Sequence, residues 1–573
     1  MQLENIELDK SKLDSLHSRL LNDGLGYEYQ KGNHLVPPET SIIGSHNLGL
    51  SGRRIADIQA AHRQWLNVAH TTLSTQEGLQ LIKSLLSDDD RKKLELDHYQ
   101  PSKPLYSNDN GYITSANLTR IDHLYDGNGN ILGCDPNLVP LGAAYAHAYT
   151  EGVGNIIDPN TLLGSLDVYE QRLARIATSD KQRISGIVTS TKYPLWRMHL
   201  YMTNLVRERY DVPMYVIPPE AIDQNSGQVD LKLVKGLYER LGIKLADMDN
   251  LSQAGALIRY CRELPKIANP DVRVINPAGL RIMESQLWNA LISLPGYNSY
   301  HKRLTGQETD LDLHRSTYIP SSLIRVYLTD AQIATSIDDN GQITWEMDTT
   351  KLPGFEDLMK IKGTRPNYQG YLKTLSTSGN KGARKISEKR AEIVPSMNAA
   401  YLDIYHISPP GEGTVMLVQP YIRSISSLYG DEPQSHRIDI YLSGMDHALM
   451  SAASCNTPYV EKAHGGSNAT YGLVYDTQKL YPDFDFDQNG KNHTSEQPIN
   501  GNDIKEALGI EGGPIIRVLL EQIGNYSKAR YLEGLLQVKE ALSAAGIVIT
   551  PKQNYETQQI VAGMLDNVLK GGS

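Results

Sequence analysis

The amino-acid sequence predicts a mixed α/β fold, of α/β class with α+β elements, and three observations carry this prediction. Residues 184–217 read strand, helix, strand; residues from about 310 to 480 read as strands and hairpins; and both ends of the chain read as helical. Strands that alternate with helices indicate a mostly parallel sheet covered by helices. A chain of 573 residues is too long for one core, so we expect several packed domains.

Composition narrows the classes of function. Hydrophobic residues make up 40% of the chain and charged residues 21%, which is ordinary for a soluble globular protein. The net charge of −10 and the lack of a basic block argue against nucleic acid as a partner. The N-terminal sequence has no signal-peptide pattern, and no run of about 18 apolar residues predicts a membrane span, so we expect a cytoplasmic protein. Three scattered cysteines cannot form a disulfide framework or a zinc site.

The first region, residues 1–115, is predicted to be helical. Apolar residues recur at helical spacing over Ile55–Val68 and Glu77–Leu86. The acidic run Asp88–Asp90 is interpreted as a solvated turn between helices.

The second region, residues 116–310, is predicted to be an α/β domain, to which the family resemblance described below assigns a substrate role. Its first element is a hairpin of Leu118–Tyr125 and Ile131–Cys134. A strand–helix–strand unit follows, and the remaining spacing predicts three helices and one strand. The unit consists of the strand Ile184–Thr189, the helix Leu195–Arg209 and the strand Pro213–Ile217. The three further helices are expected at Leu231–Leu241, Leu251–Leu264 and Leu280–Leu294, and the further strand at Val272–Asn276.

The third region, residues 311–480, is predicted to bind nucleotide, and the fourth, residues 481–573, to be a loop followed by helices. The strands expected in the third region are Tyr371–Leu375, Val415–Ile422, His436–Leu442 and Ala448–Ser454, with a turn at Asp338–Gly341. Near the C-terminus the spacing places Leu532, Leu535, Leu536 and Leu542 on one helix face.

A Ser/Gly-rich turn after the strand Tyr371–Leu375 is the strongest candidate for a phosphate site. Small residues let backbone N–H groups approach an anion, and lysine adds a compact charge for phosphate oxygens. The residues expected to contact nucleotide here are Lys373, Ser376, Ser378, Gly379, Lys381 and Gly382. The turn matches neither GxxxxGK[ST] nor GxGxxG, so an ordinary hairpin with solvated lysines is the alternative. Lys360 and Lys362 are rival candidates for the phosphate role.

Later strands supply companions for this turn. The strand Val415–Ile422 contains Pro420, which cannot continue a ladder, so backbone groups of Gln419, Tyr421 and Ile422 are expected to be free for the edge of a purine. The next strand alternates and places Arg437, Asp439 and Tyr441 on one face. A same-face surface ion pair is the alternative interpretation of Arg437 and Asp439.

This order of parts resembles the ATP-grasp superfamily. Its members have a strand lysine with a Gly-rich loop, a hinge strand that reads adenine, a strand pair with arginine and acidic residues, and an Asn-containing metal segment, here Asn456 or Asn468. Upstream, Arg120-Ile-Asp122 and Asp135-Pro-Asn137 are similar to an element of glutathionylspermidine-synthetase-like and circularly permuted ATP-grasp proteins. Asn276-Pro277 with the Ser285–Leu291 helix resembles a segment that precedes the ATP-grasp fold in many ligases.

The resemblance implies an ATP-grasp fold preceded by an α/β parallel-sheet domain, and a Mg²⁺- and ATP-dependent carboxylate–amine ligase that proceeds through an acyl phosphate. Its substrates would be a small carboxylate and an amine, such as an amino acid or peptide, and a homodimer is left open. The roles it implies are catalytic for Lys373 and Arg437, metal-binding for Asp439 and Asn468, and substrate-binding for Arg120, Asp122 and Asn137.

Departures from the family pattern keep alternatives open. Gln286 stands where a lysine is usual, Asp135 replaces a glutamate, and Glu461 lies seven residues before Asn468 instead of forming a Glu-x-Asn pair. A non-catalytic nucleotide-binding or calcium-binding regulatory protein and an ATP-grasp kinase for a small alcohol are therefore the alternatives. Residues 485–496 have the spacing of an EF-hand calcium loop, with a polar surface loop as the competing interpretation.

Overall fold

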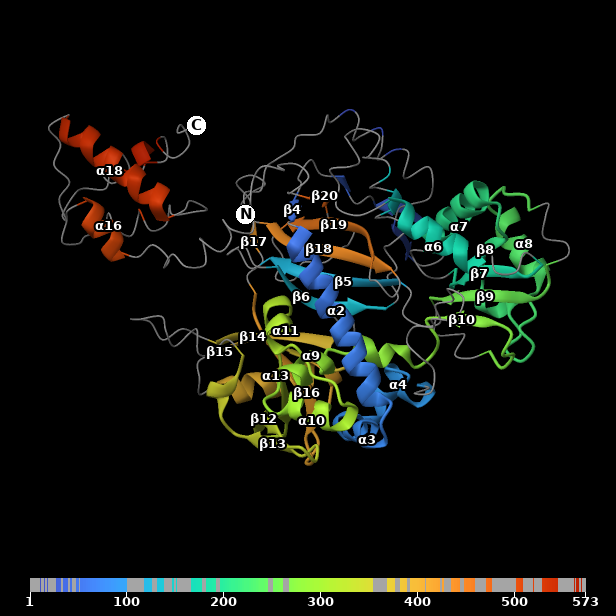
Figure 1. Ribbon diagram of the computed structural model, residues 1–573, viewed down its shortest axis with the longest axis horizontal. Coiled ribbons are helices and arrows are strands. Elements are labelled where there is room, and N and C mark those ends of the chain that lie inside the picture. Colours follow the sequence, from blue (N-terminus) through green and yellow to red (C-terminus); the bar gives the residue numbers. More distant parts are fainter. Residues whose placement is uncertain are drawn as a thin grey trace. The chain divides into compact units, whose positions relative to one another are not determined.

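A computed structural model of the chain describes most of its secondary structure (Figure 1). Apart from short pieces and isolated positions, the described residues are 27–31, 34–39, 48–50, 52–99, 118–125, 131–138, 166–177, 182–191, 196–245, 251–260, 267–353, 368–376, 382–388, 392–407, 409–422, 434–443, 448–458, 470–476, 501–508 and 528–544. The chain divides into two compact units, Gln2–Tyr481 and Pro482–Ser573, with Met1 assigned to the second. The fold is mixed α/β, as the sequence predicts, with both parallel and antiparallel sheets.

The largest sheet has eight strands and carries the predicted hairpin. Its strands pair antiparallel, except that β20 pairs parallel with β3 and β4. The main path runs β3 (Ile42–Ile43), β20 (Thr470–Asp476), β19 (Ala448–Pro458), β18 (Gln434–Ser443), β5 (Leu118–Tyr125) and β6 (Ile131–Asn137), with β4 (Leu48–Leu50) and β17 (Ile425–Ser426) off it. Strand β5 of the predicted hairpin thus pairs with β18, a strand more than 300 residues later in the chain.

The second sheet has six antiparallel strands and carries the predicted phosphate turn. Its order is β13 (Ile343–Glu346), β12 (Ala331–Ile337), β11 (Ser322–Val326), β16 (Thr414–Pro420), β14 (Tyr368–Lys373) and β15 (Ala383–Glu388). Successive residues of β16 face opposite sides of this sheet. Val415 and Leu417 enter a core shared with the helices, whereas Met416 and Val418 pack against helix α13 (Ile393–Tyr405).

The third sheet is parallel throughout, as the predicted strand–helix–strand unit requires. Its order is β10 (Arg273–Ile275), β9 (Ala254–Arg259), β7 (Ile184–Val188) and β8 (Met214–Ile217). Every residue of β7, β8 and β9 is buried, which is typical of a parallel sheet covered on both faces. A separate antiparallel hairpin consists of β1 (Tyr27–Lys31) and β2 (His34–Glu39).

Helices fill the space around these sheets (Figure 1). In Gln2–Tyr481 they are α2 (Gly52–Leu73), α3 (Gln76–Leu85), α4 (Asp88–Lys93), η1 (Leu96–His98), α6 (Leu166–Ala177), α7 (Trp196–Tyr210), η4 (Pro219–Ala221), α8 (Leu231–Glu239), η5 (Leu280–Glu284), α9 (Leu287–Ser293), α10 (Tyr297–Thr305), α11 (Leu311–Thr317), η6 (Thr349–Lys351) and α13. Helix α2 places Trp65 in a core that also holds Trp288 of α9 and Ile438 of β18. In Pro482–Ser573 the helices are α16 (Gly501–Leu508) and α18 (Lys528–Ala544).

Several expectations for local structure were wrong. The helix expected over Leu251–Leu264 is strand β9 where it is described, because the unbroken apolar run of β9 is buried on both sides of a parallel sheet. Asp88–Asp90 begins helix α4 instead of a turn, since Ser87 caps it and Asp90 is buried. The helical first region also contains strands β1 to β4, and Leu536 is exposed instead of lying on the buried face of α18.

The helix expected over Leu280–Leu294 is divided. A 3₁₀ turn, η5, ends at Glu284, and the α-helix α9 begins at Leu287. Ser285 and Gln286 lie in the break. The Ser285 side chain contacts Leu375, just beyond the end of β14, and the Gln286 side chain contacts Asp135 of β6. Among the described helices, none is long and apolar enough to cross a membrane.

Candidate active site

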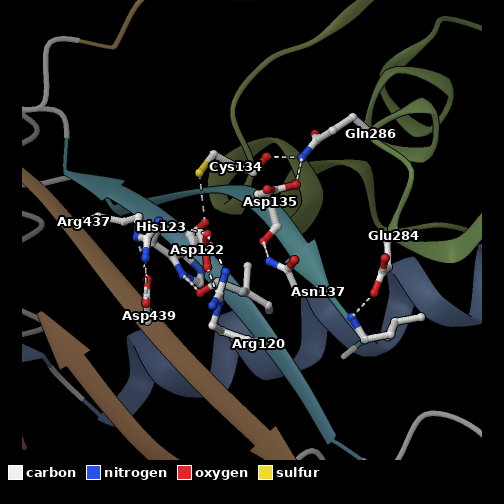
Figure 2. A network of polar contacts seen from close by, with 12 residues as sticks. Arg120, Asp122, His123, Cys134, Asp135, Asn137, Glu284, Gln286, Arg437 and Asp439 are labelled. Atoms are coloured by element: carbon white, nitrogen blue, oxygen red, sulfur yellow. Dashed lines mark hydrogen bonds and ion pairs between the residues drawn. The ribbon is translucent and has the colours of Figure 1, made fainter. Parts of the chain in front are cut away.

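The candidate site lies where β5 pairs with β18. Each strand contains the tripeptide Arg-Ile-Asp, as Arg120–Asp122 and as Arg437–Asp439. The register places Asp439 directly opposite Asp122 and Tyr441 opposite Arg120. Residues two apart on a strand face the same side, so all four charged side chains lie on one face of the sheet (Figure 2).

These four residues form a buried ion-pair cluster. Arg120 approaches Asp122 with Nε 2.6 Å from Oδ1 and donates from Nη2 to Oδ2 at 3.0 Å. Arg437 contacts Asp439 in the same way, at 2.7 Å from Nε to Oδ1 and 2.9 Å from Nη2 to Oδ2. Nη1 of Arg437 also lies 3.4 Å from Oδ2 of Asp122, which links the two pairs. Since the Asp439 side chain is only 2% exposed, this is not the surface pair that was the alternative interpretation.

The two opposed aspartates differ in electrostatics. Burial alone would raise the pKa of Asp122, but Arg120 and Arg437 outweigh burial and hold that pKa below its ordinary value. Burial raises the pKa of Asp439, and Arg437 offsets this only in part. The cluster therefore keeps Asp122 firmly ionised, because two guanidinium groups face it.

Asp135 on β6 is the third carboxylate of the site, and it was not among the predicted site residues. It pairs with Asp122 across the hairpin and forms no ion pair among the described residues. Burial and then the charge of Asp122 raise the pKa of Asp135 to about 6, against the opposing effect of Lys373. A carboxylate with a raised pKa is one whose charge a nearby cation would stabilise.

Lys373, the predicted phosphate ligand, belongs to the same region. It ends strand β14 and is half-buried. Its charge acts on both Asp135 and Cys134 of β6, lowering the pKa of each against stronger opposing effects. The predicted phosphate lysine and the predicted substrate hairpin are thus neighbours.

The turn after Lys373 connects two paired strands. Strands β14 and β15 pair up to Lys373 and Ala383, and the Thr374 N–H donates to the Gly382 carbonyl at 2.9 Å. The hydroxyl of Ser376 is buried and has no hydrogen-bond partner within the described part of the chain. Ser378, Gly379 and Lys381 lie outside the described residues, so their predicted phosphate contacts stay predictions.

The predicted adenine hinge is only partly free. Strand β16 ends at Pro420, as the proline predicts. However, the Tyr421 N–H donates to the Gln369 carbonyl at 3.0 Å, so the sheet already uses this donor. The buried side chain of Gln419 donates to Ser321 Oγ at 2.8 Å and to Gln286 Oε1 at 3.3 Å. Ile422 is half-buried at the end of this segment.

Asn137, the remaining substrate candidate, lies two residues beyond Asp135. Its Nδ2 donates to the Asp135 carbonyl at 3.2 Å, which makes Oδ1 the acceptor end of the side chain. Asn468, Glu461, Lys360, Lys362 and residues 485–496 lie outside the described residues, and of Asn456 only the backbone, in β19, is described.

A second polar cluster was missed in the sequence because its members are far apart in the chain. His147, Glu151 and Glu170 have ligand atoms close enough to hold a metal ion. Arg209 already lies between the carboxylates, donating to Glu170 at 2.6 Å and also to Glu151, and His147 Nε2 lies 2.8 Å from Glu170. Because an arginine supplies the cation, the cluster is complete as an ion-pair network, and we assign it no metal.

Comparison with known proteins gives little further guidance. No protein-family model and no curated protein matches the chain. Similar solved structures include a glutathione synthetase-like effector from Globodera pallida in apo form, with 9% identity, covering 83% of this chain and 100% of that chain at a TM-score of 0.44. Another is a Methylobacillus flagellatus protein provisionally named gamma-glutamylcysteine synthetase, with 11% identity, covering 73% and 86% at a TM-score of 0.34. We draw no conclusion about fold or function from TM-scores this low.

Proposed function

We propose that the protein is an ATP-dependent carboxylate–amine ligase with an ATP-grasp nucleotide site. The observation that carries the proposal is the convergence of separate candidate segments, since β5, β6, β18 and the end of β14 bring Asp122, Asp135, Asp439 and Lys373 into one electrostatically coupled cluster. An ordinary hairpin with solvated lysines gives no reason for Lys373 to lie close enough to Asp135 to lower the pKa of that carboxyl.

In this proposal Lys373 and the loop to Gly382 hold the phosphates of ATP. The backbone N–H groups of the loop and the lysine neutralise charge that develops on the transferred phosphoryl group. The carboxylate substrate attacks the γ-phosphorus, the bond to the β-phosphate oxygen breaks, and ADP leaves. An amine then attacks the acyl carbon of the acyl phosphate, loses a proton, and releases inorganic phosphate as the amide forms.

Magnesium would be held mainly by Asp135 and Asn137. Mg²⁺ takes hard oxygen ligands, keeps several waters and uses one or two protein carboxylates plus substrate phosphates. Asp135 fits this description because it is ionisable, close to Lys373 and, among the residues that the structure describes, outside any ion pair. Asp439 was the sequence-based candidate together with Asn468, but Arg437 contacts both of its carboxylate oxygens. When bound, the ion would neutralise phosphate charge.

Arg437 and Arg120 would then orient the carboxylate substrate. A guanidinium group binds a carboxylate by two parallel hydrogen bonds, which fixes both distance and direction. Both arginines already form ion pairs with aspartates, so a substrate carboxylate would bind to guanidinium N–H groups that these ion pairs do not use. Asp122, held ionised by two arginines, is suited to contact a cationic amine.

The test is release of ADP from Mg-ATP with mixtures of amino acids, in wild type and in Lys373→Ala. We expect stimulated release in wild type and at least a hundredfold loss in the variant, because phosphoryl transfer depends on charge neutralisation, where one lost contact costs about 10²–10³ in rate. Lys232→Ala, an exposed lysine of α8, is the matched control and should leave the rate unchanged.

Trapping with hydroxylamine separates the ligase from the alternatives. An acyl phosphate gives a hydroxamate, whereas the phosphate ester made by a kinase would not react. Mg-ATP binding without turnover, over a broad set of carboxylates and amines, would favour a regulatory protein and contradict the ligase.

A further inference from the structure

Gln286 occupies the break between η5 and α9 and contacts both sheets of the site. Its side chain is buried, and Nε2 donates to the Cys134 carbonyl and, at 3.2 Å, to Oδ1 of Asp135 on β6 (Figure 2). Its Oε1 accepts from Nε2 of Gln419 on β16 at 3.3 Å. One amide thus joins the eight-stranded sheet to the six-stranded sheet beside the candidate site.

The orientation of this amide is determined by its partners. The Cys134 carbonyl can only accept a hydrogen bond, and an ionised Asp135 can only accept, so the NH₂ end must face β6. A flipped amide would place an oxygen against two oxygens. Gln286 therefore presents donors to Asp135 in a fixed direction.

The neighbouring residue Ser285 contacts the other half of the site. Its hydroxyl donates to the Leu375 carbonyl at 2.7 Å, two residues beyond Lys373. Consecutive residues at the start of α9 therefore hold Asp135 on one side and the first residues of the phosphate turn on the other. This arrangement fixes where the carboxylate stands relative to the loop.

The neutrality of the Gln286 side chain matters as much as its geometry. Of the charged side chains described at the site, Arg120, Asp122, Arg437 and Asp439 are engaged with one another, which leaves Asp135 and Lys373. A neutral amide stabilises an ionised Asp135 by hydrogen bonding without neutralising it. The carboxylate consequently retains its charge for an incoming cation.

We propose that Gln286 is a positioning residue that fixes the direction of the Asp135 carboxylate, so that this carboxylate can contact the Mg²⁺ that accompanies ATP. This inference rests on the proposed nucleotide site. It adds to that site the residue that positions the proposed carboxylate ligand of the metal.

The experiment measures ATP affinity by calorimetry, once with Mg²⁺ and once with EDTA, in wild type, Gln286→Leu and Gln286→Lys. Wild type should bind more tightly with Mg²⁺. In Gln286→Leu the affinity with Mg²⁺ should fall about tenfold or more, in line with a lost hydrogen bond to a charged group, and the affinity in EDTA should stay the same. In Gln286→Lys the added cation should raise affinity in EDTA and remove most of the gain from Mg²⁺.

The control is Gln332→Leu, which removes a half-buried glutamine of β12 whose carbonyl accepts from the Tyr327 hydroxyl at 3.1 Å. It should alter neither affinity. If Gln286→Leu does not fold, Gln286→Lys still tests the inference, because its ammonium group keeps donors at this position and predicts a change of opposite sign in EDTA.

Three outcomes overturn the inference. A merely structural role would lower affinity with and without Mg²⁺ by the same factor in both variants. Wild-type binding that is equal in Mg²⁺ and EDTA would overturn the inference and leave the nucleotide site standing. Wild type that binds no ATP in either condition would remove the proposed function together with the inference.

Discussion

Single side chains of this protein show how burial alters chemistry that the sequence cannot reveal. His199 lies in helix α7, where its side chain is 1% exposed and its ring lies 4.3 Å from the ring of Tyr260. Neither ring nitrogen has a hydrogen-bond partner within the described part of the chain. Burial lowers the pKa of His199 from 6.5 to about 3.

Buried histidines predict a loss of stability in mild acid. Burial also lowers the pKa of His123 and of His314 to about 4. Because the folded pKa lies below the unfolded value, the folded state binds fewer protons, and stability that is complete above about pH 6.5 falls as the pH decreases towards 4. We expect a loss of up to about 2 kcal/mol per histidine at pH 5.

His199→Phe should reduce this acid sensitivity, measured as the free energy of unfolding between pH 5 and 8. The variant removes one group that must be charged on unfolding, so its slope against pH should be shallower than that of wild type. His98→Phe, at an exposed position, is the control. Equal slopes for wild type and His199→Phe would contradict the prediction.

The residues of the site were predictable only in part. Arg120, Asp122, Arg437 and Asp439 were all selected from the sequence, and the structure brings them together. Their division into substrate, catalytic and metal roles was not predictable, because it depends on which carboxylate each arginine contacts. Asp135, Gln286 and Ser285 were not selected as site residues, since their roles arise from contacts between two sheets.

Among helices and strands, apolar spacing identified most elements but could not separate a short buried strand from a helix. Strand β9 is apolar from Ala254 to Ile258, so neither the helical nor the strand period is visible there, and burial in a parallel sheet decides for the strand. The pairing of β5 with β18 also could not be predicted, because no local signal connects strands so far apart.

Helix α10 offers a matched test of how backbone crowding limits an element. Gly296 precedes it with φ 90°, and a Cβ there would lie 2.0 Å from the Ile337 carbonyl oxygen of β12. Gly306 follows it with φ 75° and has no atom within 4 Å of such a Cβ. Both need a left-handed backbone, and only Gly296 is crowded.

Gly296→Ala should therefore destabilise the protein by about 2–4 kcal/mol, through left-handed strain and a clash with rigid backbone. Gly306→Ala should cost about 1 kcal/mol, from the backbone conformation alone. Denaturant unfolding of both variants gives the comparison. Equal losses would show that the contact with β12 relaxes without cost.

The division of the chain into two units leads to a prediction about the whole molecule. The unit Pro482–Ser573 has a core of its own, whose described buried residues extend from Ile504 to Leu565. We expect a fragment of residues 482–573 to show helical circular dichroism and one cooperative melting transition. A fragment of residues 1–481 should keep the nucleotide affinity of the full chain, because all candidate site residues lie within it.

Absence of a cooperative transition in the short fragment would contradict its independence. Loss of nucleotide affinity in the long fragment, with its melting temperature unchanged, would instead place a nucleotide contact in the C-terminal unit.

The pairing of β5 with β18 has a consequence for how the protein is made on the ribosome. Arg437 lies 315 residues after Asp122, so at a synthesis rate of roughly 5–20 residues per second the first Arg-Ile-Asp emerges about 15–60 seconds before the second. During that interval the hairpin of β5 and β6 has an unpaired edge, and Asp122 has only one of its two arginine partners. The nascent chain must keep this edge from pairing elsewhere until its last partner has been translated.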